Sequence, residues 1–118
     1  MVNFLTRPVA QMFAKYGEDF TLDRAGSLTP RRGLMVPMSN SDTAVYFDAN
    51  ESVGLLKPAL SLYLPGTDAK GNTEDPPLEG DIFVRSGAAN VGGRLWTVRK
   101  TWPSVVNGSI IIWLALCD

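Results

Sequence analysis

From Phe20 onward, apolar residues recur at every second position, in short segments separated by glycine, proline, asparagine and serine. A period of two places alternate side chains on opposite faces of a β-strand, so each segment has one apolar face. Leu60, Leu62 and Leu64 are the clearest example. About seven such segments lie between residues 18 and 117, which predicts a mostly-β chain folded as a small barrel or sandwich.

The N-terminal segment has a different period. Val9, Met12 and Tyr16 recur at a spacing close to four, which places them on one face of a helix. Pro8 suits the first turn, where its missing N–H costs little, and Gly17 is a natural C-terminal stop. We therefore predict one short helix, about residues 6–16, which must dock on an apolar surface because it is too short to be stable alone.

Three further segments give specific expectations. Residues 110–116 are apolar at both sets of alternating positions, which is typical of a strand buried on both faces or covered by a partner. Residues 65–80 contain three prolines and three glycines among acidic and polar residues, which predicts a long surface loop. Trp96, Val98 and Trp102 fall on one alternating set, and we interpret them as core.

Composition limits the class of protein. A length of 118 residues predicts one domain over residues 1–118, and the 45% hydrophobic and 19% charged residues are typical of globular proteins. The net charge of -1 provides no overall field that would hold a polyanion. The N-terminus does not resemble a signal peptide, and the longest apolar run is far shorter than the roughly 20 residues of a membrane-spanning helix. We therefore expect a soluble protein without membrane contact.

The residue types of most catalytic sites are missing. The chain has no histidine and one cysteine, which excludes Ser/His and Cys/His nucleophiles and cysteine-based zinc sites, and it has no P-loop motif. Neighbouring acids such as Glu79 and Asp81 lie beside turn residues, where acids more often serve solubility than acid–base catalysis. Asp42, Asp48 and Glu51 do not follow the EF-hand spacing. We expect no catalytic residues, no metal and no cofactor.

An oligonucleotide-binding barrel is an alternative, because Trp96 and Trp102 could stack on bases beside a basic patch. Arg99 and Lys100 would point to opposite faces of a strand, which weakens a single binding stripe. This alternative predicts salt-dependent quenching of tryptophan fluorescence by single-stranded DNA. The basic residues of such a patch would be Arg7, Arg31, Arg32, Arg94, Arg99 and Lys100.

Several short motifs follow one another in a distinctive order. An amphipathic helix ends in Lys15-Tyr16-Gly17, and Thr21-Leu22-Asp23-Arg24 follows in a strand. The C-terminal half has Leu78-Glu79-Gly80-Asp81, then Arg94-Leu95-Trp96-Thr97-Val98, Trp102-Pro103 and Asn107-Gly108 before an apolar strand. This order, over nearly the whole chain, resembles the head-closure (neck) proteins of tailed bacteriophages, whose ending is similar to "P-x-x-G-D … G-x-x-[WY]-x-V … P … G".

The resemblance implies a small β-barrel with an N-terminal helix that forms a six- or twelve-fold homo-oligomeric ring in the virion neck, after assembly in the cytoplasm of a bacterial host. Such a ring lies between the portal or adaptor protein and a tail-completion or tail-tube protein. It closes the filled head, docks the tail, and transiently surrounds packaged double-stranded DNA. The alternative within phages is a tail-terminator or other tail-end ring protein, and copurification with heads or with tails separates the two.

In some members of this family a loop between early strands plugs the channel. The matching position here is residues 39–56, and residues 65–80 are a second candidate for a projecting loop. We expect that deletion of residues 67–74 leaves the fold intact, because a solvent-exposed loop contributes little to the core. The residues that we assign to ring, partner or channel contacts are Ser39, Asn40, Ser41, Asp42, Tyr46, Phe47, Asp48, Asn50, Glu51, Thr67, Asp68, Lys70, Asn72 and Glu74.

Overall fold

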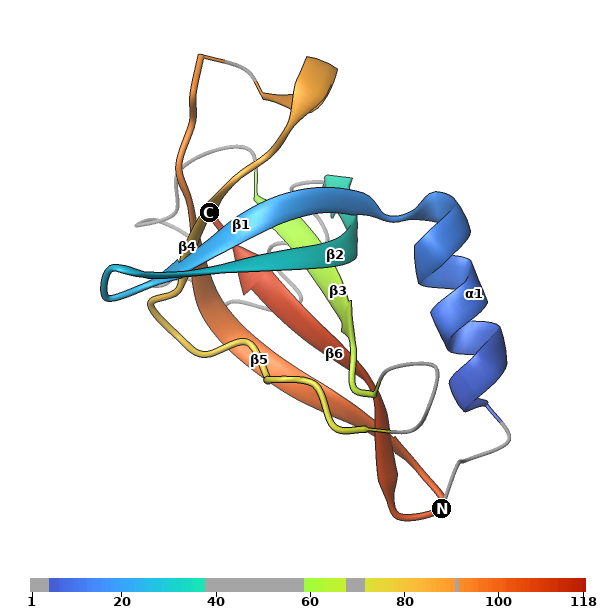
Figure 1. Ribbon diagram of the computed structural model, residues 1–118. Helices are drawn as coiled ribbons and strands as arrows, with labels where there is room; N and C mark the ends of the chain where they lie inside the picture. Colours follow the sequence, from blue (N-terminus) through green and yellow to red (C-terminus); the bar gives the residue numbers. More distant parts are fainter. Residues whose placement is uncertain (1–4, 38–58, 68–71, 91) are drawn as a thin grey trace.

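A closed barrel of six strands, with one helix against its outer surface, is the architecture of the computed structural model (Figure 1). The structure describes residues 5–37, 59–67, 72–90 and 92–118. The predicted fold class, mostly β with one short N-terminal helix, is confirmed, and the barrel is the correct choice between barrel and sandwich. The elements are α1 (Thr6–Tyr16), β1 (Glu18–Arg24), β2 (Ser27–Pro37), β3 (Leu60–Pro65), β4 (Ile82–Val84), the 3-10 turn η1 (Gly87–Ala89), β5 (Trp96–Val106) and β6 (Ser109–Cys117).

The strands follow the order β1-β2-β3-β6-β5-β4 around the barrel, and β4 pairs back with β1 to close it. Each neighbouring pair is antiparallel. The further strand predicted near residues 43–47 lies outside the described residues.

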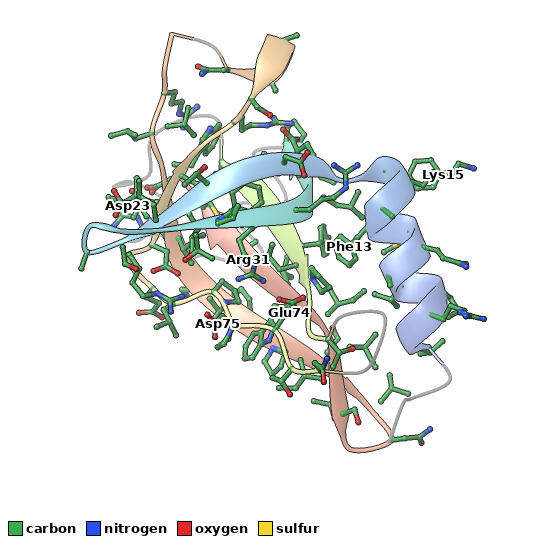
Figure 2. All side chains as sticks on the ribbon, in the orientation of Figure 1. Phe13, Lys15, Asp23, Arg31, Glu74 and Asp75 are labelled. Carbon is green, nitrogen blue, oxygen red and sulfur yellow. The ribbon has the colours of Figure 1, made fainter. Side chains whose placement is uncertain are left out.

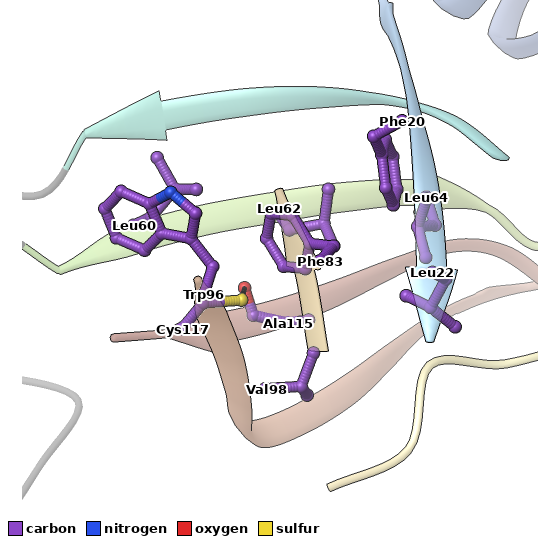
Figure 3. Close-up of a cluster of buried hydrophobic side chains, with 10 residues drawn as sticks. All are labelled: Phe20, Leu22, Leu60, Leu62, Leu64, Phe83, Trp96, Val98, Ala115 and Cys117. Atoms are coloured by element: carbon purple, nitrogen blue, oxygen red, sulfur yellow. Dashed lines mark hydrogen bonds between the residues drawn. The ribbon is translucent and has the colours of Figure 1, made fainter. Parts of the chain in front are cut away.

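Buried apolar side chains from β1, β3, β4, β5 and β6 form the main core cluster inside the barrel (Figure 3), and the partly buried Met35 of β2 packs against it. The rings of Phe20 and Phe83 lie 5.2 Å apart between centroids, across the pairing of β1 with β4. The alternation that predicted β3 is also the pattern of burial, because Leu60, Leu62 and Leu64 all face this core. The buried members are Phe20, Leu22, Leu60, Leu62, Leu64, Phe83, Trp96, Val98, Ala115 and Cys117.

A β-bulge in β5 changes which of its residues face the core. The register with β6 shifts between Val98 and Lys100, so Arg99 is the extra residue on the β5 side. Trp96 and Val98 are buried, whereas Trp102 is 38% exposed. The prediction that Trp102 shares the core face is therefore wrong, because an inserted residue moves every later side chain to the opposite face of the strand.

Helix α1 lies against the outer face of β2, β3 and β6 (Figure 1). Its buried anchor is Phe13, and Met12 lines a space of about 350 Å³ together with the outward side chain of Ile112 in β6. Arg32 of β2 donates from Nε to the Phe13 carbonyl and from Nη2 to the Ala14 carbonyl, both at 2.9 Å. The guanidinium thus supplies hydrogen bonds to carbonyls at the helix end, where the Phe13 carbonyl also accepts the Gly17 N–H at 2.9 Å. The helix covers part of the outer face of β6. This agrees with the sequence of β6, which is apolar on both faces of the strand.

Candidate docking surfaces

The connection between β3 and β4 lies against the barrel for much of its length. Pro65 belongs to β3, the Gly66 N–H donates to the Ile111 carbonyl at 2.8 Å, and Pro77 is fully buried. The prediction of a surface loop over residues 65–80 is therefore wrong at Pro65, Gly66 and Pro77, whereas residues 78–80 are exposed as predicted. We call residues 75–81 the strap, because they cross the barrel wall as a fixed segment.

A partly buried ion pair holds the strap. The Asp81 side chain is 2% exposed, and Arg24 of β1 donates to it from Nε and Nη2, each at 2.9 Å. Arg24 Nη2 also donates to the Pro76 carbonyl at 2.9 Å, and the Leu78 N–H donates to Asp81 Oδ2 at 2.9 Å. The hydrogen bonds to Asp81 raise the pKa of Arg24, against the opposing effect of desolvation. We call this arrangement the Arg24–Asp81 latch.

Arg31 makes a second attachment to the strap. It lies beside Glu74 and Asp75 (Figure 2), and its Nη1 donates to the Asp75 carbonyl at 2.8 Å. Its Nη2 is the buried side-chain nitrogen without a hydrogen-bond partner among the described residues. Burial lowers the pKa of Arg31, and the neighbouring carboxylates oppose that shift. Because Glu74, Asp75 and Asp81 outnumber Arg24 and Arg31, this site does not attract a free anion.

The outer face of β2, β1 and β4 forms an open concavity of about 750 Å³, which we call the outer groove. Register places Pro30, Thr21 and Val84 in one row across the three strands, and Leu28, Asp23 and Ile82 in the next. Leu28 is 67% exposed, and Leu95, which also lines the groove, is 58% exposed. The solvated face of an antiparallel sheet is normally polar, so this apolar surface is unusual.

The two acidic side chains of the outer groove, Asp19 and Asp23, have different partners. At one end Arg32 Nη1 lies 3.0 Å from Asp19 Oδ1. At the other end Asp23 Oδ1 accepts the Gly26 N–H at 2.8 Å within the β1–β2 turn. The groove therefore presents no basic field to a nucleic acid backbone, and its apolar centre is better suited to a protein surface.

The β5–β6 hairpin extends past the end of the barrel (Figure 1), and the molecule is 43 Å long in this elongated shape. Asn107 and Gly108 form its turn with φ of 50° and 77°, the left-handed conformation that two-residue hairpins require. Val105 is 58% exposed beside this turn. Residues 102–110, which we call the hairpin tip, contain no charged side chain.

The basic residues considered for a nucleic-acid patch are directed to different partners. Arg99 Nε donates to the buried carboxylate of Asp118 at 2.6 Å. The guanidinium of Arg94 lies over the Trp96 ring, 3.7 Å from its centroid, and Trp96 itself is buried. Arg32 is held by α1 and Asp19. Trp96 is therefore not placed to stack on a base.

Few of the predicted contact residues lie in the described part of the chain. Thr67 pairs with Thr73 in an isolated antiparallel bridge, Asn72 is exposed, and the Glu74 N–H donates to the Gly66 carbonyl at 3.0 Å. The outer groove and the hairpin tip were not among the predicted surfaces. Outside the described residues lie Ser39, Asn40, Ser41, Asp42, Tyr46, Phe47, Asp48, Asn50, Glu51, Asp68 and Lys70.

No group of three or more acidic or cysteine side chains among the described residues is arranged to hold a metal ion. Within the same ranges, no helix has the length and apolar character needed to cross a membrane. No protein-family model, curated protein or solved structure matches this chain.

Proposed function

We propose that this chain is a structural protein of the phage neck, which forms a ring between the portal or adaptor protein and the tail, closes the DNA-filled head and docks the tail. The supporting observation is that the motif order coincides with element boundaries. Lys15-Tyr16-Gly17 ends α1, Gly80-Asp81 leads directly into β4, and Asn107-Gly108 forms the last hairpin turn.

The surface properties suit an assembly protein. A subunit of a ring needs apolar surface that is separate from its own core, and the outer groove and the hairpin tip both provide it. The net charge of -1 is compatible with DNA that passes through a ring without being held there. The strap is fixed by the latch, so the barrel offers a defined surface on that side.

Filled heads that lack tails and lack this protein provide the test. Adding the purified protein should retain DNA in these heads, place density at the portal vertex in negative-stain images, and restore joining to free tails. Heads that bind no protein and leak DNA as before would contradict the proposal. Binding to the upper end of isolated tails, with no binding to heads, would instead identify a tail-terminator.

An oligonucleotide-binding barrel is the second candidate, and the exposure of Trp102 favours it. Base stacking on Trp102 would quench tryptophan fluorescence when single-stranded DNA is added, and Trp102→Phe would abolish that change. The buried Trp96 supplies the matched control, because Trp96→Phe should leave any quenching by DNA in place. The neck proposal predicts no quenching at physiological salt.

A further inference from the structure

We propose that the outer groove of one subunit binds the hairpin tip of a second copy of this chain, so that subunits join head to tail. This inference rests on the proposed ring function and names the two surfaces that would form the ring contact. It also accounts for the exposed apolar residues at two places on this small barrel, the outer groove and the hairpin tip.

The outer groove has the features of a receiving site. The rows Pro30-Thr21-Val84 and Leu28-Asp23-Ile82 are fixed by the register of three strands, so the surface exists before a partner arrives. Leu28 and Leu95 are among the most exposed large apolar side chains of the described residues, and both line the same 750 Å³ concavity. Among the described elements, α1 lies against β2, β3 and β6 and leaves the face of β1 and β4 open.

The hairpin tip has the features of an inserting element. It extends beyond the barrel, it is narrow, and its turn is fixed by Asn107 and Gly108 in the left-handed conformation. Val105 exposes an apolar side chain beside that turn, next to the exposed Pro103 and Ser104. A preformed apolar hairpin loses little conformational entropy when it enters a groove.

Electrostatics favour an uncharged occupant such as the hairpin tip over a nucleic acid. The hairpin tip has no charged residue, and the Asp19–Arg32 pair already neutralises the charges at one end of the groove. Insertion of the tip therefore adds no charge to the groove, and the Asp23 carboxylate there keeps its hydrogen bond from the Gly26 N–H. A nucleic acid would meet the carboxylates of Asp19 and Asp23 there, which oppose its binding.

The position of the two surfaces determines the kind of assembly. Because the groove and the tip lie on different parts of the chain, their contact is heterologous, and each subunit keeps one free groove and one free tip after the first contact. Contacts of this type repeat and produce a ring when the rotation between subunits closes. A typical stable contact covers about 800 Å² on each partner, so two of them require about a quarter of the 6969 Å² surface of one subunit.

Two single substitutions and their mixture test this arrangement. Leu28→Lys places a charge in the groove and leaves the tip intact, whereas Val105→Lys places a charge on the tip and leaves the groove intact. Tyr16→Lys is the matched control, because Tyr16 is 65% exposed on α1, away from both surfaces. Thermal melting should be unchanged in all three variants, because these side chains are exposed.

Sedimentation velocity from micromolar to millimolar protein gives the readout. The wild type and Tyr16→Lys should associate as the concentration rises, whereas Leu28→Lys and Val105→Lys should each stay monomeric. An equimolar mixture of the last two should form a dimer and nothing larger, because only one intact groove and one intact tip remain. A monomeric wild type at millimolar concentration, an associating Val105→Lys variant, or a mixture that stays monomeric would each overturn the inference.

The head-joining assay separates this inference from the neck proposal. If the wild type joins heads to tails and both lysine variants do so equally well, the groove–tip contact is refuted and the neck role stands. If the wild type fails to join heads to tails but the sedimentation pattern holds, the neck role is refuted and the contact stands.

Discussion

Replacing Asp81 with alanine should destabilise the barrel more than any other single change to an acidic residue of the strap. The substitution removes the acceptor for two guanidinium hydrogen bonds from Arg24 and for the Leu78 N–H, each at 2.9 Å. It also leaves Arg24 with only the Pro76 carbonyl from this arrangement. The strap would then be attached chiefly through its backbone and through Arg31.

The expected magnitude follows from burial. Removing one partner of a fully buried ion pair costs about 3–5 kcal/mol. Asp81 is 2% exposed, but the side chain of Arg24 is 37% exposed, so water can hydrate the abandoned guanidinium. We therefore expect a loss of about 2–4 kcal/mol in the free energy of unfolding. For a chain of this length, that loss lowers Tm by roughly 10 °C.

Urea denaturation followed by tryptophan fluorescence measures this loss. Glu79→Ala is the matched control, because Glu79 is exposed on the same strap, so it should change stability by less than about 0.5 kcal/mol. Asp81→Ala should cost about 1–3 kcal/mol less in an Arg24→Ala background than in the wild type. An equal cost in both backgrounds, or a cost near that of Glu79→Ala, would refute the latch.

Three other changes test separate parts of the fold. Arg32→Ala removes the guanidinium from the α1 carbonyls and should cost about 1–2 kcal/mol in urea denaturation, whereas Arg32→Lys should recover only part because it lacks the planar fork. Gly33→Ala places a Cβ 2.7 Å from the Tyr63 carbonyl and should cost about 1–3 kcal/mol; an unchanged midpoint would refute this close contact. Burial raises the pKa of the Cys117 thiol, so a thiol reagent should label it only on unfolding. Above a pH of about 8.5 the unfolded thiol ionises while the native thiol does not, so stability should fall as pH rises.

Local sequence signals were sufficient to predict the helix and the last hairpin. α1 spans Thr6–Tyr16, the predicted range, because the proline and glycine limits act within a few residues of the helix ends. The Asn107-Gly108 turn also formed as its residues indicate, because both adopt positive φ. Features of this kind can be predicted because the residues that determine them are neighbours in the sequence.

The strap shows why composition alone misled the prediction for residues 65–80. Prolines and glycines there indicate irregular backbone, which is correct, but irregular backbone need not be exposed. Pro77 is fully buried, and a proline has no N–H that burial would leave unpaired. The latch joins Arg24 to a residue 57 positions later, and no local pattern indicates that pairing.

The outer groove could not be predicted from local sequence either, because it depends on the register between strands. Alternation identifies which face of a strand enters the core, but it does not show whether apolar residues on the other face meet. Leu28 and Ile82 each lie on an outward position, and they become one surface only because both are opposite Asp23 in β1. A shift of one residue in either pairing would turn them to the opposite face. The proposed subunit contact therefore depends on the register of three strands. Leu28→Lys should abolish assembly without lowering the stability of the barrel.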